Sequence, residues 1–233
     1  EDIYNRGKIP ILVGGTGFYI QAVLNDIAFT KEKQGDEIRA DLQNLAKEKG
    51  ASYLHHELQK VDKESAEAIH PNNIKRVIRA LEYFQSTGQK FSDHNKEERQ
   101  KGSPYNFLYL VLTMNRKVLY ERIDKRVDQM MEEGLVKEVK QLLDAGYSRN
   151  LVSMQGLGYK EIASALFKEC TMEEAVYRLK RDTRHFAKRQ MTWFRRERDV
   201  TMINKDNFSN NHDIVNYIMK LAVEKGICSC REG

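Results

Sequence analysis

Cysteine is scarce in this chain, and long apolar runs are missing altogether. The three cysteines, Cys170, Cys228 and Cys230, cannot all pair with one another and show no framework of spacings. This excludes a disulfide scaffold and predicts a reducing compartment, hence a cytoplasmic protein. No apolar run approaches the roughly 20 residues of a membrane span, and no signal-peptide pattern precedes Pro10. The sequence therefore predicts no membrane association.

Signatures of metal sites and of activated nucleophiles are also absent. His55-His56-Glu57 lacks the i, i+4 histidine pair of a metalloprotease helix. Cys228-Ser229-Cys230 has neither zinc spacing nor histidine partners. No Ser/His/Asp arrangement stands out. The residues of this chain therefore predict no metal site of their own.

Charge is plentiful, with a small basic excess. The 39 Lys and Arg residues outnumber the 34 Asp and Glu residues, for a net charge of +5 over 233 residues. Such a balance is compatible with a polyanionic partner but is also common in proteins that bind none. The location of the basic residues is therefore more informative than their sum.

The order of apolar segments predicts an α/β protein interrupted by helices. The apolar run from Ile9 to Val13 predicts a strand that passes through a glycine turn into a helix. Further strands are predicted over 107–113 and 200–203. Polar helices fill the interval between the first two strands. We therefore expect a core made of 1–30 and 103–233, with a helical insertion at 31–102.

The helices are predicted from their apolar periodicity and their end signals, with Asn115 as a cap and Gly88 as a stop. Two clear strands and one weak strand are too few for a covered parallel sheet. Because Glu1 is not an initiating Met, we expect the remaining strands to lie before it. The predicted helical ranges are 36–48, 52–59, 63–69, 73–87, 116–145, 158–168, 172–198 and 213–225.

The glycine turn GGTG, Gly14 to Gly17, is a candidate anion site. Its free backbone N–H groups and the positive end of the helix that it opens both attract negative charge, and the Thr16 hydroxyl adds a donor. The alternative is an ordinary tight turn in which Thr16 caps the helix, and on the turn alone this is the better account. No GK[ST] follows for a Walker A motif, and Ile20 replaces the third glycine of GxGxxG.

The segment 171–197, TMEEAVYRLKRDTRHFAKRQMTWFRRE, predicts a long helix with a cationic face. Thr171 and Glu174 form a capping pattern at its start. Asp182 is the only acid between Arg178 and Arg196, and a face of one sign suggests a phosphate partner, although a merely solvated face is the alternative. The predicted packing side holds Val176, Leu179, Thr183, Phe186, Ala187, Gln190, Trp193 and Phe194, and the predicted cationic side holds Arg178, Arg181, Arg184, His185, Lys188, Arg189, Arg195 and Arg196.

Smaller basic groups occur elsewhere. Lys75, Arg76 and Arg79 follow the sequence HPNN, and Arg122 and Arg126 lie one helical turn apart so that both project the same way. Arg39 stands alone in GDEIRADL. For each of these groups taken alone, surface solvation or a structural ion pair is the more ordinary explanation.

Several of these segments, in this order, closely resemble one family. LVGGTGFYIQAVL, HPNNIKRVIRALEYFQSTG, RVDQMMEEGLVKEV, MQGLGYKE and TRHFAKRQMTWFR are similar to the bacterial tRNA dimethylallyltransferases, and the likeness runs from about Ile9 to Ile203. The resemblance implies a P-loop NTPase-like α/β core with a helical insertion that embraces the tRNA anticodon stem-loop. It also implies transfer of a dimethylallyl group from dimethylallyl diphosphate, with Mg²⁺, to N6 of the adenosine 3′-adjacent to the anticodon. The resemblance implies as well that this base is flipped out of the loop during the reaction.

The same resemblance assigns roles to individual residues. Thr16 and Arg39 correspond to family residues at the reaction centre. Arg122 and Arg126 correspond to arginines that hold the diphosphate, whose charge grows as the allylic C–O bond breaks. The residues that it implies for tRNA binding are Lys75, Arg76, Arg79, Gly156, Gly158, Tyr159, Lys160, Lys188, Arg189, Gln190, Trp193 and Arg195.

The chain departs from the family at its front. Neither the P-loop, G-x-T-x-x-G-K-[ST], nor the DSxQ segment with its general-base Asp occurs in these residues. We therefore expect the 233-residue chain to be inactive alone, and to be monomeric like the family. The main alternative is a non-catalytic RNA-binding module. A nucleotide kinase relative is disfavoured, because phosphate transfer explains neither an RNA-sized basic face nor a long helical insertion.

Overall fold

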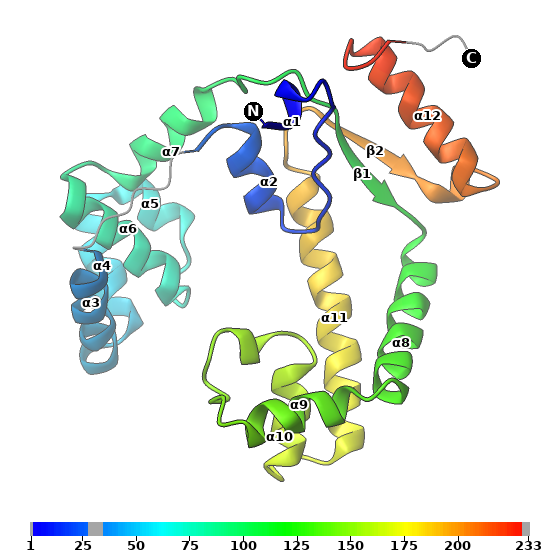
Figure 1. The fold of residues 1–233 in the computed structure, drawn as a ribbon. Helices are drawn as coiled ribbons and strands as arrows, with labels where there is room; N and C mark the ends of the chain where they lie inside the picture. Colours follow the sequence, from blue (N-terminus) through cyan, green and yellow to red (C-terminus); the bar gives the residue numbers. More distant parts are fainter. Residues whose placement is uncertain (1, 28–34, 230–233) are drawn as a thin grey trace. The chain divides into compact units, whose positions relative to one another are not determined.

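The computed structural model describes residues 2–27 and 35–229, and the chain divides into two compact units. Unit 1 consists of Glu1–Gly17 and Asn106–Gly233, and unit 2 of Phe18–Tyr105. Unit 2 contains the predicted insertion, 31–102, and extends beyond it at both ends. Figure 1 labels the helices and strands of both units.

A parallel two-stranded sheet lies in unit 1. Strands β1 (Tyr109–Thr113) and β2 (Val200–Asn204) run side by side (Figure 1). In their register Val111 lies opposite Met202. Parallel strands need a long crossover, and a set of helices supplies it here. The predicted class, an α/β core of P-loop-like type with a helical insertion, is confirmed.

The predicted strand from Ile9 to Val13 is wrong. This segment has no regular structure, and Val13 is 88% exposed. A strand forms only through hydrogen bonds to a neighbouring strand, and none of the residues that the structure describes pairs with this segment. The helix predicted after the glycines does form, as α2 (Gly17–Leu24), and a short helix, α1 (Asp2–Asn5), precedes the segment.

The crossover of unit 1 is helical throughout. The helix predicted over 116–145 is in fact two helices, because Gly134 adopts a φ of 104°, a left-handed conformation that separates them. Asn115 caps the first as predicted, since its side chain accepts a hydrogen bond from the Lys117 N–H at 2.9 Å. The elements are α8 (Arg116–Glu132), α9 (Leu135–Asp144), η1 (Ser153–Gln155), α10 (Tyr159–Leu166), α11 (Met172–Phe194), η2 (Lys205–Asn207) and α12 (Asn211–Glu224).

The apolar core of unit 1 forms around the first half of α11. Ala175 and Leu179 of α11 are buried together with Ile162 of α10. Thr171 and Glu174 exchange side-chain and backbone hydrogen bonds at the start of α11, which confirms the predicted capping box. A fully buried Leu or Ile contributes about 1.5–3 kcal/mol, so this packing fixes α11 against α8 and α10.

Unit 2 is a helical bundle with a core of its own, centred on Leu54, Leu58 and Val77. Gly88 ends α6 with a φ of 72°, as predicted. Helix α7 was missed by the sequence prediction, because Phe91 is its only large apolar residue. The helices are α3 (Gly35–Lys49), α4 (Ala51–Val61), α5 (Lys63–Ala68), α6 (Ile74–Thr87) and α7 (Phe91–Gln100).

A buried carboxylate joins three helices of unit 2. Asp62 is only 1% exposed and lies between α4 and α5. It accepts hydrogen bonds from the Ser65 backbone N–H (3.0 Å), the Ser65 hydroxyl (2.6 Å) and the Ser92 N–H at the start of α7 (2.9 Å). Burial by itself raises the pKa of Asp62, but these hydrogen bonds outweigh it and hold the pKa below its usual value.

We predict that Asp62→Asn lowers the free energy of unfolding by about 2–3 kcal/mol, because a helix cap and a buried charge-assisted hydrogen bond are both weakened. A carboxylate with a lowered pKa stabilises the fold above its unfolded pKa and loses this effect as the pH falls through the folded value. The wild-type protein should therefore lose stability below about pH 4 more steeply than the variant does. Urea unfolding followed by circular dichroism measures both effects. Asp41→Asn, at an exposed position of α3, is the control, and equal stability of the two variants would contradict the assignment.

Candidate functional site

The GGTG turn of unit 1 is held by the side of α11. The Gln190 side-chain amide Nε2 donates a hydrogen bond to the Gly15 carbonyl oxygen at 2.7 Å. Thr16, the next residue, is exposed, and its hydroxyl has no hydrogen-bond partner among the described residues. The turn is thus anchored on one side, while its hydroxyl group is left available to a ligand.

Two glycines of this turn are required by contact with α11. A Cβ atom at Gly15 would lie 2.3 Å from Gln190 Nε2, and one at Gly17 would lie 2.2 Å from Cδ1 and Nε1 of the Trp193 indole. Neither distance is sterically possible without displacement of the helix side chain or of the turn. Gly15 and Gly17 therefore serve a close approach of the backbone to α11.

The second half of α11 carries exposed cations. Lys188, Arg189 and Arg195 are exposed and have no acidic partner within the described part of the chain. The guanidinium of Arg189 lies over the Phe186 ring, 5.8 Å from its centroid. Phe186 was predicted to pack and is instead 42% exposed, because the core around α11 ends before this turn of the helix.

The first half of α11 is neutralised by acids on α8, which corrects part of the predicted cationic face. Arg184 donates to both carboxylate oxygens of Asp124, at 2.6 and 2.8 Å, and Lys180 pairs with Asp128 at 2.6 Å. From Lys180 to Arg184 the chain advances by four residues, while their partners go back by four, from Asp128 to Asp124, so the two helices run antiparallel. Arg181 pairs with Asp182 at 2.8 Å. The cationic face is therefore shorter than the sequence predicts.

Arg122 and Arg126 lie on α8, one turn apart as predicted. Both are exposed, and neither has an ion-pair partner in the ranges that the structure describes. They alternate along the helix with Asp124 and Asp128, which are engaged with α11. Helix α8 thus separates its charges, with acids toward α11 and arginines elsewhere on its surface.

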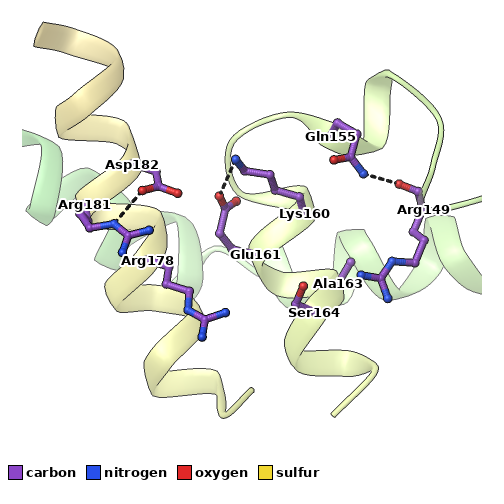
Figure 2. Close-up of a pocket in the computed structure, with 9 residues that line it drawn as sticks. All are labelled: Arg149, Gln155, Lys160, Glu161, Ala163, Ser164, Arg178, Arg181 and Asp182. Carbon is purple, nitrogen blue, oxygen red and sulfur yellow. Dashed lines mark hydrogen bonds and ion pairs between the residues drawn. The ribbon is translucent and has the colours of Figure 1, made fainter. Parts of the chain in front are cut away.

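A cavity of about 540 Å³ lies between α10 and α11 (Figure 2). Lys160 extends from α10 toward Glu161, whose Oε1 is 3.3 Å from the Lys160 ammonium. The second oxygen of Glu161 accepts the Gly158 N–H at 2.9 Å and so fixes the start of α10. The lining residues are Arg149, Gln155, Lys160, Glu161, Ala163, Ser164, Arg178, Arg181 and Asp182.

Most of the cations at this cavity are compensated. Arg149 forms a two-bond ion pair with Glu169, at 2.5 and 2.9 Å, and Lys160 and Arg181 have the acidic neighbours given above. Arg178 is the one lining cation without an acidic partner within the described residues, and Figure 2 shows it extending from α11 on the side that faces α10. The Tyr159 hydroxyl bonds to Glu138, which raises the pKa of Tyr159. The cavity is therefore a weaker anion site than its count of cations implies.

In unit 2 the predicted basic residues gather on α3 and α6. Lys75 and Arg76 are exposed in the first turn of α6, where the helix dipole disfavours positive charge unless an anion is bound. Glu82, only 4% exposed, accepts Arg39 Nε and Nη2 at 3.2 and 2.8 Å and Arg79 Nη1 at 3.2 Å. Arg39 and Arg79 are thus held by one buried carboxylate.

The predicted site residues fall into two groups. Thr16, Arg122 and Arg126 lie in unit 1 with the α10 and α11 residues, whereas Arg39 and the α6 cations lie in unit 2. A meeting of Arg39 with Thr16 stays a prediction from the family resemblance. Within residues 2–27 and 35–229, no group of three or more His, Cys, Asp or Glu side chains is arranged to hold a metal ion.

Some functional neighbours were missed by the sequence reasoning. The pairing of Asp124 and Asp128 with α11 could have been suspected from their i, i+4 spacing, and Glu82 from its place beside the α6 cations. The contact of Gln190 with Gly15 had no local signal, because 175 positions separate the two residues.

The fold and the site together define an α/β protein with a glycine turn at a basic helix, and comparisons with known proteins agree. The IPP transferase family model matches residues 1–197. The tRNA dimethylallyltransferase of Lachnoclostridium phytofermentans is 56% identical over 227 residues, which is 97% of this chain and 72% of the relative.

Solved structures give the same result. The full-length tRNA isopentenylpyrophosphate transferase of Bacillus halodurans is 41% identical with a TM-score of 0.63, over 97% of this chain and 70% of that one. A eukaryotic dimethylallyltransferase, described as acting on tRNA, is 27% identical with a TM-score of 0.72, over 94% and 59% of the two chains. The chain belongs to the IPP transferase family.

We predict that Glu82→Gln lowers the free energy of unfolding by about 1–2 kcal/mol, because two half-exposed arginines lose their shared charge partner. Arg39→Ala should lower it by a similar amount. Urea unfolding measures both variants, with Glu37→Gln at an exposed position of α3 as the control. If Glu82→Gln has the stability of the control, the ion pairs do not contribute to the fold. If Arg39→Ala leaves kcat unchanged, its predicted place at the reaction centre is wrong.

Proposed function

We propose that this protein is a tRNA dimethylallyltransferase, a prenyltransferase that modifies adenosine in the tRNA anticodon loop. In this reaction the N6 amine of the adenosine 3′-adjacent to the anticodon attacks the allylic carbon of dimethylallyl diphosphate. A C–N bond forms, the allylic C–O bond breaks, diphosphate leaves and the amine loses a proton. The family membership of the chain supports this reaction class.

One structural observation carries the proposal. An exposed Thr16 sits in a glycine turn that is hydrogen-bonded to α11, and α11 also presents Lys188, Arg189 and Arg195 without acidic partners among the described residues. A hydroxyl group beside a cationic helix suits a substrate with phosphate groups. A non-catalytic RNA-binding module, the alternative, would need the cations but not the close fit of the turn to α11.

The diphosphate is assigned to α8. Arg122 and Arg126 are exposed and unpaired within the described chain, and they project together, so both guanidinium groups can hold one diphosphate. The leaving group gains charge as the C–O bond breaks, and fixed cations stabilise that charge. Thr16 and, from unit 2, Arg39 are assigned to the reaction centre.

The RNA is assigned to exposed cations on both units. On α11 and at its C-cap these are Lys188, Arg189 and Arg195, and on α6 they are Lys75, Arg76 and the Glu82-bound Arg79. The start of α6 would bind a phosphate through two features, the side chains of its cations and its free backbone N–H groups. Gly156, Gly158, Tyr159 and Lys160 complete the predicted RNA surface.

Mg²⁺, the monomeric state and the location complete the proposal. We expect Mg²⁺ to bind together with the diphosphate, as is common for such substrates. Within the described residues, no group of three or more His, Cys, Asp or Glu side chains is arranged to hold it. Cys170 and Cys228 are free thiols, in keeping with the reducing cytoplasm. No helix within the described residues is long and apolar enough to cross a membrane. We expect a monomer.

The test is prenyl transfer to an anticodon stem-loop RNA, followed by mass spectrometry, with a matched RNA that carries guanosine in place of the target adenosine. We expect the dimethylallyl mass on the adenosine RNA alone, made by the full-length protein. Salt-sensitive binding of both RNAs without product would instead favour the RNA-binding module.

Arg122→Ala and Lys188→Ala should separate the two substrates. Loss of Arg122 should raise the KM for dimethylallyl diphosphate by about tenfold, because one charge-assisted contact is lost, and leave the RNA Kd unchanged. Loss of Lys188 should weaken RNA binding and reduce the slope of log K against log salt by about 0.7–0.9. Lys220→Ala, on exposed α12, is the control. The reverse pattern would show that the two roles have been exchanged.

A further inference from the structure

The segment that carries Thr16 depends on α11 for its position. Residues 8–16 form no helix or strand, and Val13 is almost entirely exposed. The bond from Gln190 to the Gly15 oxygen is the only hydrogen bond that joins residues 8–17 to a distant part of the described chain. The backbone on either side of Thr16 would otherwise be free to move, because extended chain without a neighbouring strand has little to hold it.

Helix α11 contacts the GGTG turn on both sides of Thr16. Gln190 and Trp193 are one helical turn apart, so both side chains leave α11 on the same side. The first binds the carbonyl oxygen just before Thr16, and the second covers the residue just after it. Thr16 thus lies between two neighbours that are each fixed to one helix face.

Helix α11 is a rigid support for this contact. Its first half is buried in the core through Ala175 and Leu179 and is joined to α8 by ion pairs. Its end is held by Phe194, which packs edge-on against Tyr109 of β1 with ring centroids 6.2 Å apart. Because both ends are fixed, Gln190 and Trp193 have defined positions.

We propose that Gln190 and Trp193 are positioning residues, which hold the GGTG turn so that the Thr16 hydroxyl meets the reacting groups. This rests on the proposed function, and it differs from the sequence expectation that both side chains contact tRNA. In this arrangement the amide of Gln190 is engaged by Gly15, and the indole of Trp193 covers Gly17. RNA binding on α11 is left to Lys188, Arg189 and Arg195.

The first experiment measures the turn directly. Trp193 is the only tryptophan of the 233 residues, so its fluorescence reports on this contact alone. It is 37% exposed, and release of the turn should uncover more of the indole. We expect acrylamide quenching to rise in Gln190→Ala, Gln190→Glu and Gly17→Ala. Gln141→Ala, the same substitution at an exposed position of α9, should match the wild type.

The second experiment is steady-state kinetics of these variants in the full-length protein. Loss of the amide donor should lower kcat by about tenfold to a hundredfold, because the reacting geometry loosens, while the Kd for the stem-loop RNA stays within about twofold. Gln190→Glu should be worse than Gln190→Ala, since its carboxylate would face the Gly15 oxygen. Gly17→Ala should also lower kcat, because the added Cβ atom would push the turn away from the Trp193 indole.

The outcomes are distinguishable. A kcat within about twofold of wild type in both Gln190 variants overturns the inference. So does a loss of RNA affinity that accounts for the whole defect, because Gln190 would then be an RNA contact. Unchanged Trp193 quenching in all three variants overturns it whatever the activity. Absence of product from the wild-type protein counts against the proposed function instead.

Discussion

Burial of the apolar side of α11 is the interaction on which unit 1 depends. Ala175 and Leu179 fix the first half of the helix against α10 and its neighbours, and Phe194 fixes its end against β1. Between these two points the helix makes few core contacts. This stretch carries Gln190 and Trp193, which hold the GGTG turn, and Lys188 and Arg189, which have no acidic partner among the described residues. The apolar contacts therefore hold α11 near its start and at its end, and the functional side chains lie mainly between these two regions.

In unit 2, buried polar groups fix the functional side chains in addition to the apolar core. Its apolar core sets the bundle, but two buried carboxylates, Asp62 and Glu82, fix the helix junction and the arginines of α3 and α6. Buried carboxylates are stable only where they are fully engaged, so both positions tolerate little change. The predicted reaction-centre residue Arg39 is thereby held by two hydrogen bonds to Glu82, although its side chain is 44% exposed.

Local signals in the sequence predicted most elements, and distant contacts account for part of the errors. The caps at Asn115 and Thr171 and the stop at Gly88 are each made within a few residues, so they could be read correctly. A strand over Ile9 to Val13 would need a neighbouring strand to pair with, and the apolar composition of the segment does not show whether one is present. The break at Gly134 was not predicted, because the apolar periodicity of a segment does not show that a glycine inside it adopts a positive φ. The family segments predicted the site residues, but they did not predict that Asp124 of α8 neutralises Arg184.

The pairing of α8 with α11 gives the latter helix an electrostatic gradient. Acids compensate Lys180, Arg181 and Arg184, whereas Lys188, Arg189 and Arg195 have no acidic partner among the described residues. These three lie toward the C-terminus of the helix, where its dipole tolerates positive charge. Apart from Arg178, which also lacks an acidic partner within the described residues, the uncompensated cations of α11 therefore gather toward its C-terminal end. A polyanion that approaches such a helix is steered toward that end before it makes any specific contact.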